Sequence, residues 1–234
     1  MPGYVMHLAV AEEIIKNCNI EDKIVADSLR FGSVIPDFVH NNDKRITHFW
    51  SDSNYKDFVR KPDLKAFLKK YDGMLDNTFV FGYYAHLFFD YMYVTEYWKK
   101  HFAFYDENMN PTSRYDKVEK VKLLDENVVV LRNDLFSKDM YYGDYDRIND
   151  YIVDRFGVTT LDLHPDLIQN LKLIEETNID YDASNLQDIV NFIGKCKYKG
   201  IKPKTEVLKL YELEEMIIFV ANKLSTQYKK EVGM

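Results

Sequence analysis

The chain has 234 residues, of which 46% are hydrophobic and 29% are charged. This composition is typical of a folded globular protein of one domain, and 9 Gly with 6 Pro leave little room for disordered linkers. The formal net charge of −7 argues against an extended nucleic-acid-binding surface, because such a surface needs clustered Lys and Arg. It leaves room for a local cationic pocket.

The cysteines and the hydropathy pattern indicate the compartment. Cys18 and Cys196 stand far apart and form no C-x-x-C pair, so we expect neither a disulfide framework nor a thiolate zinc site. The first residues contain no basic region and no long apolar core, and no uncharged stretch approaches the roughly 20 residues of a membrane span. We therefore expect a cytoplasmic protein without a signal peptide or a membrane span.

The first part of the chain alternates helical patterns with a polar loop. The glycine at position 32 is predicted to end the second helix in a left-handed cap before Pro36. The segment from Pro36 to Ser53 lacks helical periodicity and contains His40 and His48, so it is predicted to be a loop that carries binding residues. The apolar spacing predicts helices over residues 4–17, 21–31 and 62–73.

The most distinctive element begins at Asn77 or Thr78, either of which can cap a helix, and is predicted to continue to about Phe102. It is apolar on nearly every side, which is typical of the buried centre of a domain. Its few polar groups, His86 and Asp90, must then be satisfied in the interior.

The rest of the chain shows the same helical period. The triplet 128–130, three consecutive valines, is interpreted as part of a helix, and no alternating strand pattern of useful length is recognised. The sequence therefore predicts an all-α fold, a compact multi-helix bundle around the long apolar helix. The further helices are predicted over residues 114–138, 144–155, 165–176, 186–198 and 205–228.

His86 and Asp90 are candidate metal ligands, because residues at i and i+4 of a helix lie on one face and can reach a common point. A buried His–Asp hydrogen-bonded pair explains the same spacing equally well. Three further residues could complete a zinc or related site of nitrogen and oxygen ligands, namely His7, Asp37 and His48. Each also has a simple structural interpretation: a core histidine, a capping carboxylate and an exposed loop residue, respectively.

Four segments follow one another in the first part of the chain: His7, Gly32-Ser33-Val34-Ile35-Pro36-Asp37, Thr47-His48-Phe49 and Phe81-Gly82-Tyr83-Tyr84-Ala85-His86-Leu87-Phe88-Phe89-Asp90. Taken in order, they resemble the zinc-dependent phospholipase C family, which is related to the fungal zinc-dependent single-strand nucleases. The resemblance covers roughly the first hundred residues. It implies an all-helical fold with a cluster of zinc ions at the base of a cleft, where phosphodiesters are hydrolysed.

The resemblance also implies roles for individual residues. One ion would be held by a set of four residues, of which Asp90 would bridge to a second ion that His7 helps to bind. The counterpart of Asp37 is also a candidate general base in that family. The set of four is Asp37, His48, His86 and Asp90. We expect one helical domain over residues 1–234, with the ligands in residues 1–104 and residues 113–234 shaping the cleft.

The chain departs from the family at two points. Secreted members use an N-terminal tryptophan as a ligand, which is not found here. The family also binds a further ion with histidines after the H-x-x-x-D helix, but this chain offers only His101 and His164, neither with an acid four residues later. This site is expected to be altered or missing, and the candidate substitutes are Glu96, His101 and Asp144.

The sequence thus predicts a zinc-dependent hydrolase of a small-molecule phosphate ester, with one to three zinc ions or another divalent metal. Lys44 and Arg45 lie in the ligand-bearing loop and are candidate contacts to the phosphate, although such cations usually face solvent. The alternative is a non-catalytic helical protein in which the same residues hold a structural metal or form a buried His–Asp network.

Overall fold

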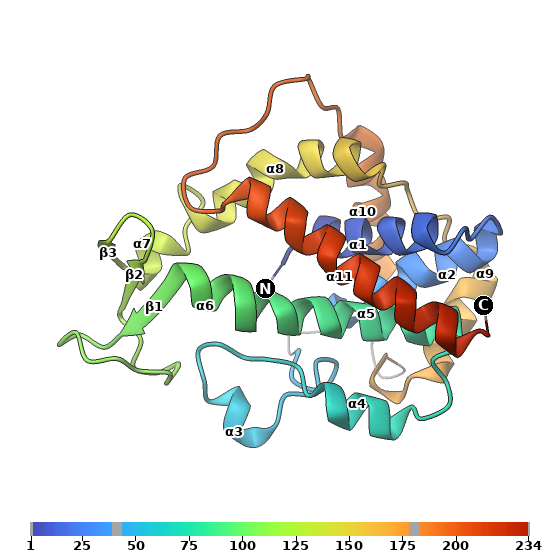
Figure 1. Cartoon of the computed structure of the whole chain (residues 1–234), viewed down its shortest axis with the longest axis horizontal. Helices are drawn as coiled ribbons and strands as arrows, with labels where there is room; N and C mark the ends of the chain where they lie inside the picture. The colour runs from blue at the N-terminus through green and yellow to red at the C-terminus, as the bar shows by residue number, and fades with distance from the viewer. Residues whose placement is uncertain (1, 39–43, 178–182, 234) are drawn as a thin grey trace.

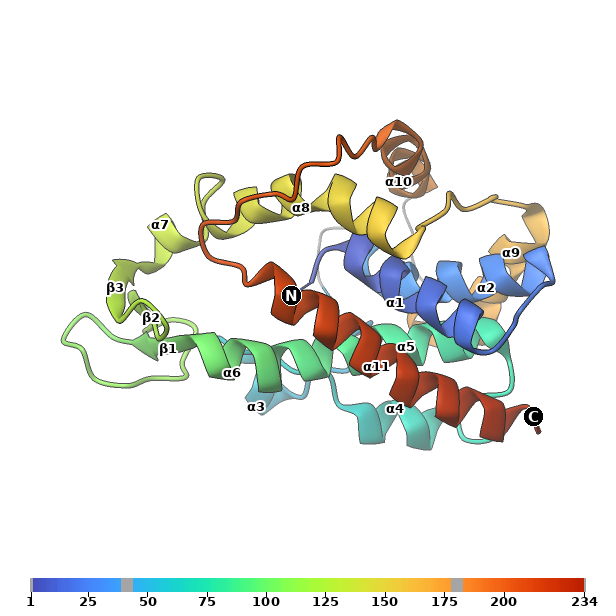
Figure 2. The same cartoon turned by 45° about the horizontal axis from the view of Figure 1, so that its top comes forward.

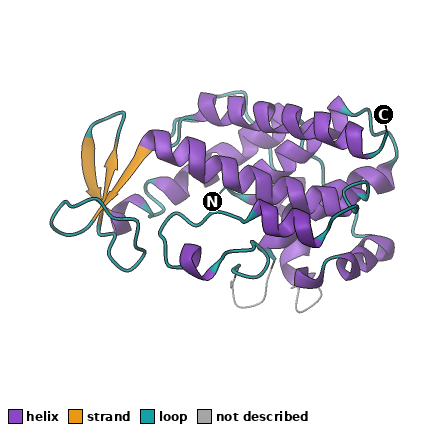
Figure 3. Ribbon diagram, turned by 60° about the horizontal axis from the view of Figure 1, so that its bottom comes forward, coloured by secondary structure: helices purple, strands orange, loops and turns teal. Residues whose placement is uncertain are grey.

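The computed structural model describes residues 2–38, 44–177 and 183–233. The protein is mostly helical, with a small antiparallel sheet at one end and the C-terminus near the other (Figures 1 and 3). Among the described residues, no helix is long and apolar enough to cross a membrane. The helices are α1 (Tyr4–Asn17), α2 (Lys23–Val34), α3 (Asp52–Tyr55), α4 (Leu64–Lys70), α5 (Thr78–Met92), α6 (Trp98–His101), α7 (Arg132–Leu135), α8 (Tyr141–Phe156), α9 (Pro165–Gln169), α10 (Ala183–Lys195) and α11 (Leu210–Glu231).

Helix α5 is buried along almost its whole length and packs against α1, α2, α4 and α11 (Figure 2). The predicted cap is confirmed: the Asn77 side chain accepts hydrogen bonds from the backbone N–H groups of Phe79 and Val80. The predicted single helix is instead divided, because a π-helical turn over Tyr93–Tyr97 separates α5 from α6, which ends at His101.

The predicted cap at Gly32 is wrong, because α2 continues through this residue to Val34. Gly32 faces Gly82 of α5, and a Cβ atom at Gly32 would lie 2.2 Å from the carbonyl oxygen of Phe79. A Cβ atom at Gly82 would likewise lie 2.3 Å from the carbonyl oxygen of Leu29. The two glycines therefore allow the backbones of α2 and α5 to touch, which is a packing role rather than a capping role.

The prediction of a helix over residues 114–138 is also wrong. The segment contains two of the three strands, and β2 pairs with both neighbours, with Val121 opposite Val130. The valine triplet belongs to a strand because branched Cβ atoms suit a pleated sheet, and Asn127, at φ 55°, turns the chain. The fold is therefore mostly helical with a small sheet, not purely all-α. The strands are β1 (Phe102–Tyr105), β2 (Lys120–Leu123) and β3 (Val128–Leu131).

The later helices occur where the helical spacing of apolar residues predicts them, but they begin and end at different residues. Helix α11 begins at Leu210 rather than at residue 205, because the carboxylate of Asp144 accepts the backbone N–H groups of residues 206–208 and holds them outside the helix. The helix predicted over 165–176 ends at Gln169 and is followed by 3₁₀ turns. Helices α8 and α10 confirm the prediction to within a few residues.

Gly32→Ala should destabilise the protein by at least about 2 kcal/mol, because the added methyl group meets helix backbone that cannot move aside without separating α2 from α5. The matched control is Gly194→Ala in α10, where the nearest atom to the new Cβ is 4.0 Å away. That change should leave stability unchanged or raise it by up to about 1 kcal/mol. Urea unfolding measures both, and equal stability of the two variants would contradict the packing role.

Candidate metal centre

Five polar side chains from four segments converge in the interior. Helix α1 supplies His7 and α5 supplies His86 and Asp90, whereas Asp37 ends the 3₁₀ turn that follows α2 and His48 lies in a turn before α3. The side chains of His48 and Asp90 are 0% exposed, and that of Asp37 is 14% exposed. The structure thus brings together the five ligands expected for the first two ions, namely His7, Asp37, His48, His86 and Asp90. His40 lies outside the described residues.

Hydrogen bonds at Nδ1 fix the orientation of two of the histidines, one to a backbone carbonyl and one to a hydroxyl. The carbonyl oxygen of Ser33 lies 2.8 Å from Nδ1 of His86 and can only accept, so this nitrogen carries the proton. The hydroxyl of Thr47 donates to the carbonyl oxygen of Pro36 at 2.8 Å, which leaves its oxygen to accept from Nδ1 of His48 at 3.1 Å. In the neutral rings the Nε2 atoms of both histidines are therefore unprotonated.

These two lone pairs face the same point. The Nε2 atoms of His48 and His86 lie 3.2 Å apart with no proton available to join them when both rings are neutral. The Nε2 atom of His48 is 3.3 Å from Oδ1 of Asp37 and 3.2 Å from Oδ2 of Asp90. The corresponding distances from His86 are both 3.6 Å. Only a cation, either a shared proton or a metal ion, makes this arrangement of electron pairs favourable.

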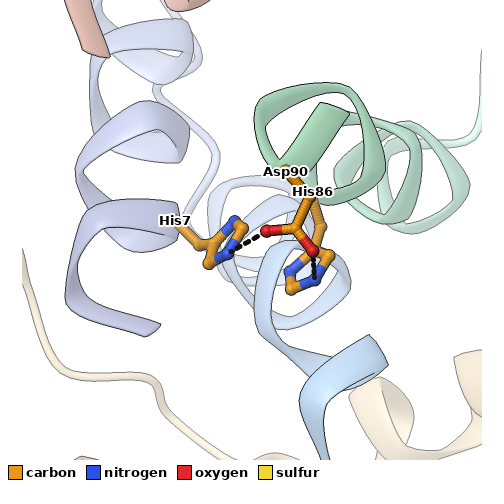
Figure 4. Close-up of side chains that lie close together, drawn as sticks. All are labelled: His7, His86 and Asp90. Atoms are coloured by element: carbon orange, nitrogen blue, oxygen red, sulfur yellow. Dashed lines mark ion pairs between the residues drawn. The ribbon is translucent and has the colours of Figure 1, made fainter. Parts of the chain in front are cut away.

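Asp90 divides its two oxygen atoms between the histidines (Figure 4). Oδ2 faces His86, whereas Oδ1 lies 3.4 Å from Nε2 of His7 on α1. Oδ2 also lies 3.2 Å from Nε2 of His48. The rings of His7 and His86 stack with their centroids 3.8 Å apart. Among the described residues, neither oxygen of Asp90 and neither nitrogen of His7 has a hydrogen-bond partner of acceptable geometry. Such buried unpaired atoms are costly unless a further group satisfies them.

Neighbouring groups keep the carboxylates of Asp37 and Asp90 ionised by lowering their pKa values. Burial alone would raise the pKa of Asp90, but His86, His48 and His7 outweigh it and lower this pKa below the usual range. The pKa of Asp37 is also lowered well below its usual range, because the Lys44 ammonium, 2.6 Å away, and the histidines outweigh burial. Both carboxylates are therefore ionised at neutral pH.

The histidines shift in opposite directions. Burial and the proximity of His7 lower the pKa of His86 to about 3. Burial would also lower the pKa of His48, but Asp37 and Asp90 outweigh it and raise this pKa. Without a metal ion, a proton on His48 is therefore the cation that the cluster can share. A metal ion in the same position would replace this proton.

The donor set and its spacing fit a zinc ion. Zinc binds imidazole nitrogen and carboxylate oxygen at about 2.0 to 2.2 Å, so two ligand atoms of a tetrahedral site lie about 3.3 to 3.6 Å apart. Five of the six distances among Asp37, His48, His86 and Asp90 span 3.2 to 3.6 Å. Two subsets have ligand atoms that all lie within 4.8 Å of one another, namely Asp37, His48, His86 and His7, His86, Asp90.

The two cations of the loop, Lys44 and Arg45, contact different groups. Lys44 contacts Asp37 and so lies at the edge of the cluster, with its side chain 26% exposed. Arg45 instead forms an ion pair with Asp52 and lies over the ring of Tyr55, outside the cluster. Of the two candidates for phosphate binding, the structure places Lys44 next to the candidate ligands.

The substitutes predicted for a third metal lie elsewhere. Glu96 is exposed on the π-helical turn. The two nitrogens of His101 face different carboxylates, Asp125 at 2.7 Å and Glu212 at 2.9 Å, so these acids lie on different sides of the ring and do not share one ligand position. Asp144 is occupied by backbone N–H groups and by Arg147. None of the three belongs to a group of candidate ligands among the described residues.

Sequence reasoning did not identify the groups that orient the ligands. The carbonyl oxygen of Ser33 and the hydroxyl of Thr47 hold His86 and His48, and the hydroxyl of Tyr83 donates to the carbonyl oxygen of Thr47 at 2.6 Å. Such outer contacts are typical of metal-binding histidines. The position of Thr47 beside His48 was a usable signal, whereas a backbone carbonyl leaves none in the sequence.

Comparison with known protein families, curated proteins and solved structures finds no match to this chain.

In metal-free protein, His86 should remain neutral with its proton on Nδ1 from pH 8 to about pH 4, because its pKa is lowered to about 3. In the unfolded chain the imidazole of His86 takes up its second proton near pH 6.5. The lowered pKa in the folded protein therefore removes stability as the pH falls from about 6.5 towards 3. Nitrogen-15 NMR of the imidazoles distinguishes the tautomers. An imidazolium signal from His86 at pH 6 would contradict the assigned orientation.

Proposed function

We propose that the protein is a metal-dependent hydrolase of small phosphate esters, with zinc as the metal. His48, His86, Asp37 and Asp90 would hold one ion, and His7 with the second oxygen of Asp90 would hold another. The convergence of two Nε2 lone pairs and two ionised carboxylates supports this proposal most strongly. The resemblance of the first hundred residues to the zinc-dependent phospholipase C family supports the reaction class.

The exposure of the cluster suggests the side from which a substrate would arrive. Asp37 and Lys44 are its partly exposed members, whereas the three histidines and Asp90 are buried. A bound zinc ion supplies Lewis acidity, which polarises a phosphoryl oxygen and makes water acidic enough to act as a nucleophile near neutral pH.

The chain's own groups would complete the reaction. The low pKa of Asp37 keeps its carboxylate ionised, so it can accept a proton from an attacking water molecule that reaches its exposed side. The ammonium of Lys44, 2.6 Å from this carboxylate, can bind a phosphate oxygen as a point charge. Because His48 and His86 are held by Thr47 and Ser33, their nitrogens need little reorganisation on metal binding.

A second function deserves a test because the cluster is so deeply buried. A structural metal also fits closed coordination by buried side chains, and a proton shared by His48 and the carboxylates fits the metal-free state. Neither alternative needs a substrate to reach the ions. Metal content and turnover, measured together, distinguish a catalytic metal, a structural metal and a metal-free cluster that shares a proton.

Zinc-loaded protein should hydrolyse bis(p-nitrophenyl) phosphate, and His86→Ala and Asp90→Ala should lose this activity together with bound zinc. Loss of outer contacts alone costs about 10- to 100-fold in metal affinity or activity, so loss of a ligand should cost at least about 100-fold. The matched control is His164→Ala, because His164 is 60% exposed and lies outside the cluster.

Two results would contradict the enzymatic proposal. Full zinc content without turnover of phosphodiesters or monoesters would favour the structural metal. Absence of bound zinc, with helicity unchanged in both ligand variants, would favour the buried network.

A further inference from the structure

A second hollow lies beside the candidate metal centre. A cavity of about 560 Å³ is lined by aromatic rings from separate segments and by two guanidinium groups, those of Arg60 and Arg132. We call it the arginine cavity. None of its lining residues is acidic, and its volume falls in the range of small-molecule sites. Its main aromatic walls are Trp50, Phe58, Trp98 and Phe136.

The two arginines carry charges that no carboxylate of the described residues offsets. Within the part of the chain that the structure describes, neither Arg60 nor Arg132 has an acidic partner, whereas each of the other five arginines has one. Both guanidinium groups instead lie over the ring of Tyr115, at 4.6 Å and 4.4 Å from its centroid. Two like charges thus lie against one aromatic ring, which favours an anion near them.

Much of the hydrogen-bonding capacity of these groups is unused. Arg60 donates through Nε to the carbonyl oxygen of Tyr55, and Arg132 donates through one terminal nitrogen to the carbonyl oxygens of Tyr115 and Val118. Each guanidinium has five N–H donors, so both retain donors without an acceptor among the described residues. Oxyanions such as phosphate match the planar fork of these donors.

The aromatic walls add a second requirement for the ligand. The ring of Trp50 lies 5.3 Å from the guanidinium of Arg60, and Trp98 is almost fully buried behind Phe58 and Phe136. Flat apolar surfaces of this kind bind planar rings by stacking and burial. Trp50 also contacts the metal centre, since its ring lies 5.3 Å from that of His48.

We propose that the arginine cavity binds a small aromatic phosphate, with the oxyanion at Arg60 and Arg132 and the planar ring against the aromatic walls. A phosphate monoester carries nearly two negative charges, which two guanidinium groups match better than a single carboxylate charge. This binding needs no metal ion and does not rest on the proposed hydrolase activity.

The two tryptophans of the chain, Trp50 and Trp98, both line the cavity, so tryptophan fluorescence reports on its occupancy. Titration of the full-length protein with adenosine 5′-monophosphate should change the emission and saturate, with and without a chelator. Adenosine and inorganic phosphate should each bind roughly 10- to 100-fold more weakly, because each lacks one of the two recognised parts.

Arg60→Gln and Arg132→Gln should each weaken binding of the nucleotide by roughly 10- to 100-fold. Arg114→Gln removes an exposed arginine that pairs with Asp116, and it should leave the affinity unchanged. Circular dichroism checks the fold, and Arg60→Lys, which keeps the charge, should retain part of the affinity.

Three outcomes would overturn the proposal. The first is no saturable change in emission. The second is equal affinity for adenosine and its phosphate, or an equal loss in Arg114→Gln, because the charges of the cavity would then not select the ligand. The third is loss of binding on chelation, which would place the ligand at the metal centre instead and would leave the proposed hydrolase standing.

Discussion

The direct contact between α2 and α5 sets the geometry of the whole site. Gly32 and Gly82 let the two backbones touch, and the residue after Gly32 then presents its carbonyl oxygen to His86 at 2.8 Å. The chain leaves α2 through the Ile35–Asp37 turn, which places Asp37 in front of the same histidine. If the two helices were held further apart, the carbonyl would lose His86 and Asp37 would move away from Asp90.

The second constraint is electrostatic. Two carboxylates and three imidazoles are removed from water in one small volume, and buried ionised groups are tolerated only when opposite charge lies close by. Lys44 offsets one charge at the exposed edge, and a proton on His48 offsets the other in the metal-free state. Oδ1 of Asp90 and both nitrogens of His7 still have no hydrogen-bond partner among the described residues. A second metal ion beside the first would give Oδ1 of Asp90 and one nitrogen of His7 a partner.

The sequence predicts the interactions between residues that are close in the chain better than those between residues that are far apart in it. The cap at Asn77 and the spacing of His86 and Asp90 are local features, and the sequence shows them directly. The approach of His7, Asp37 and His48 depends on tertiary packing, so the residue types offered them only as candidate ligands, and the family resemblance made their meeting an expectation. Gly32 was misread because a glycine near the end of a helical pattern suggests a cap, whereas its packing role depends on a partner 50 residues away. The sheet was missed because each strand has four residues, too few for alternation to outweigh a helical pattern.

We propose that the lone pairs of His48 and His86 meet at a metal ion. Anomalous diffraction at the zinc edge, from crystals of zinc-loaded protein, tests this most directly. The expected result is a peak about 2.0 to 2.1 Å from Nε2 of both histidines, with an oxygen of Asp90 as a further ligand. The claim would be contradicted by zinc bound elsewhere, or by a zinc-free cluster in which His48 donates a hydrogen bond to Asp37 or Asp90.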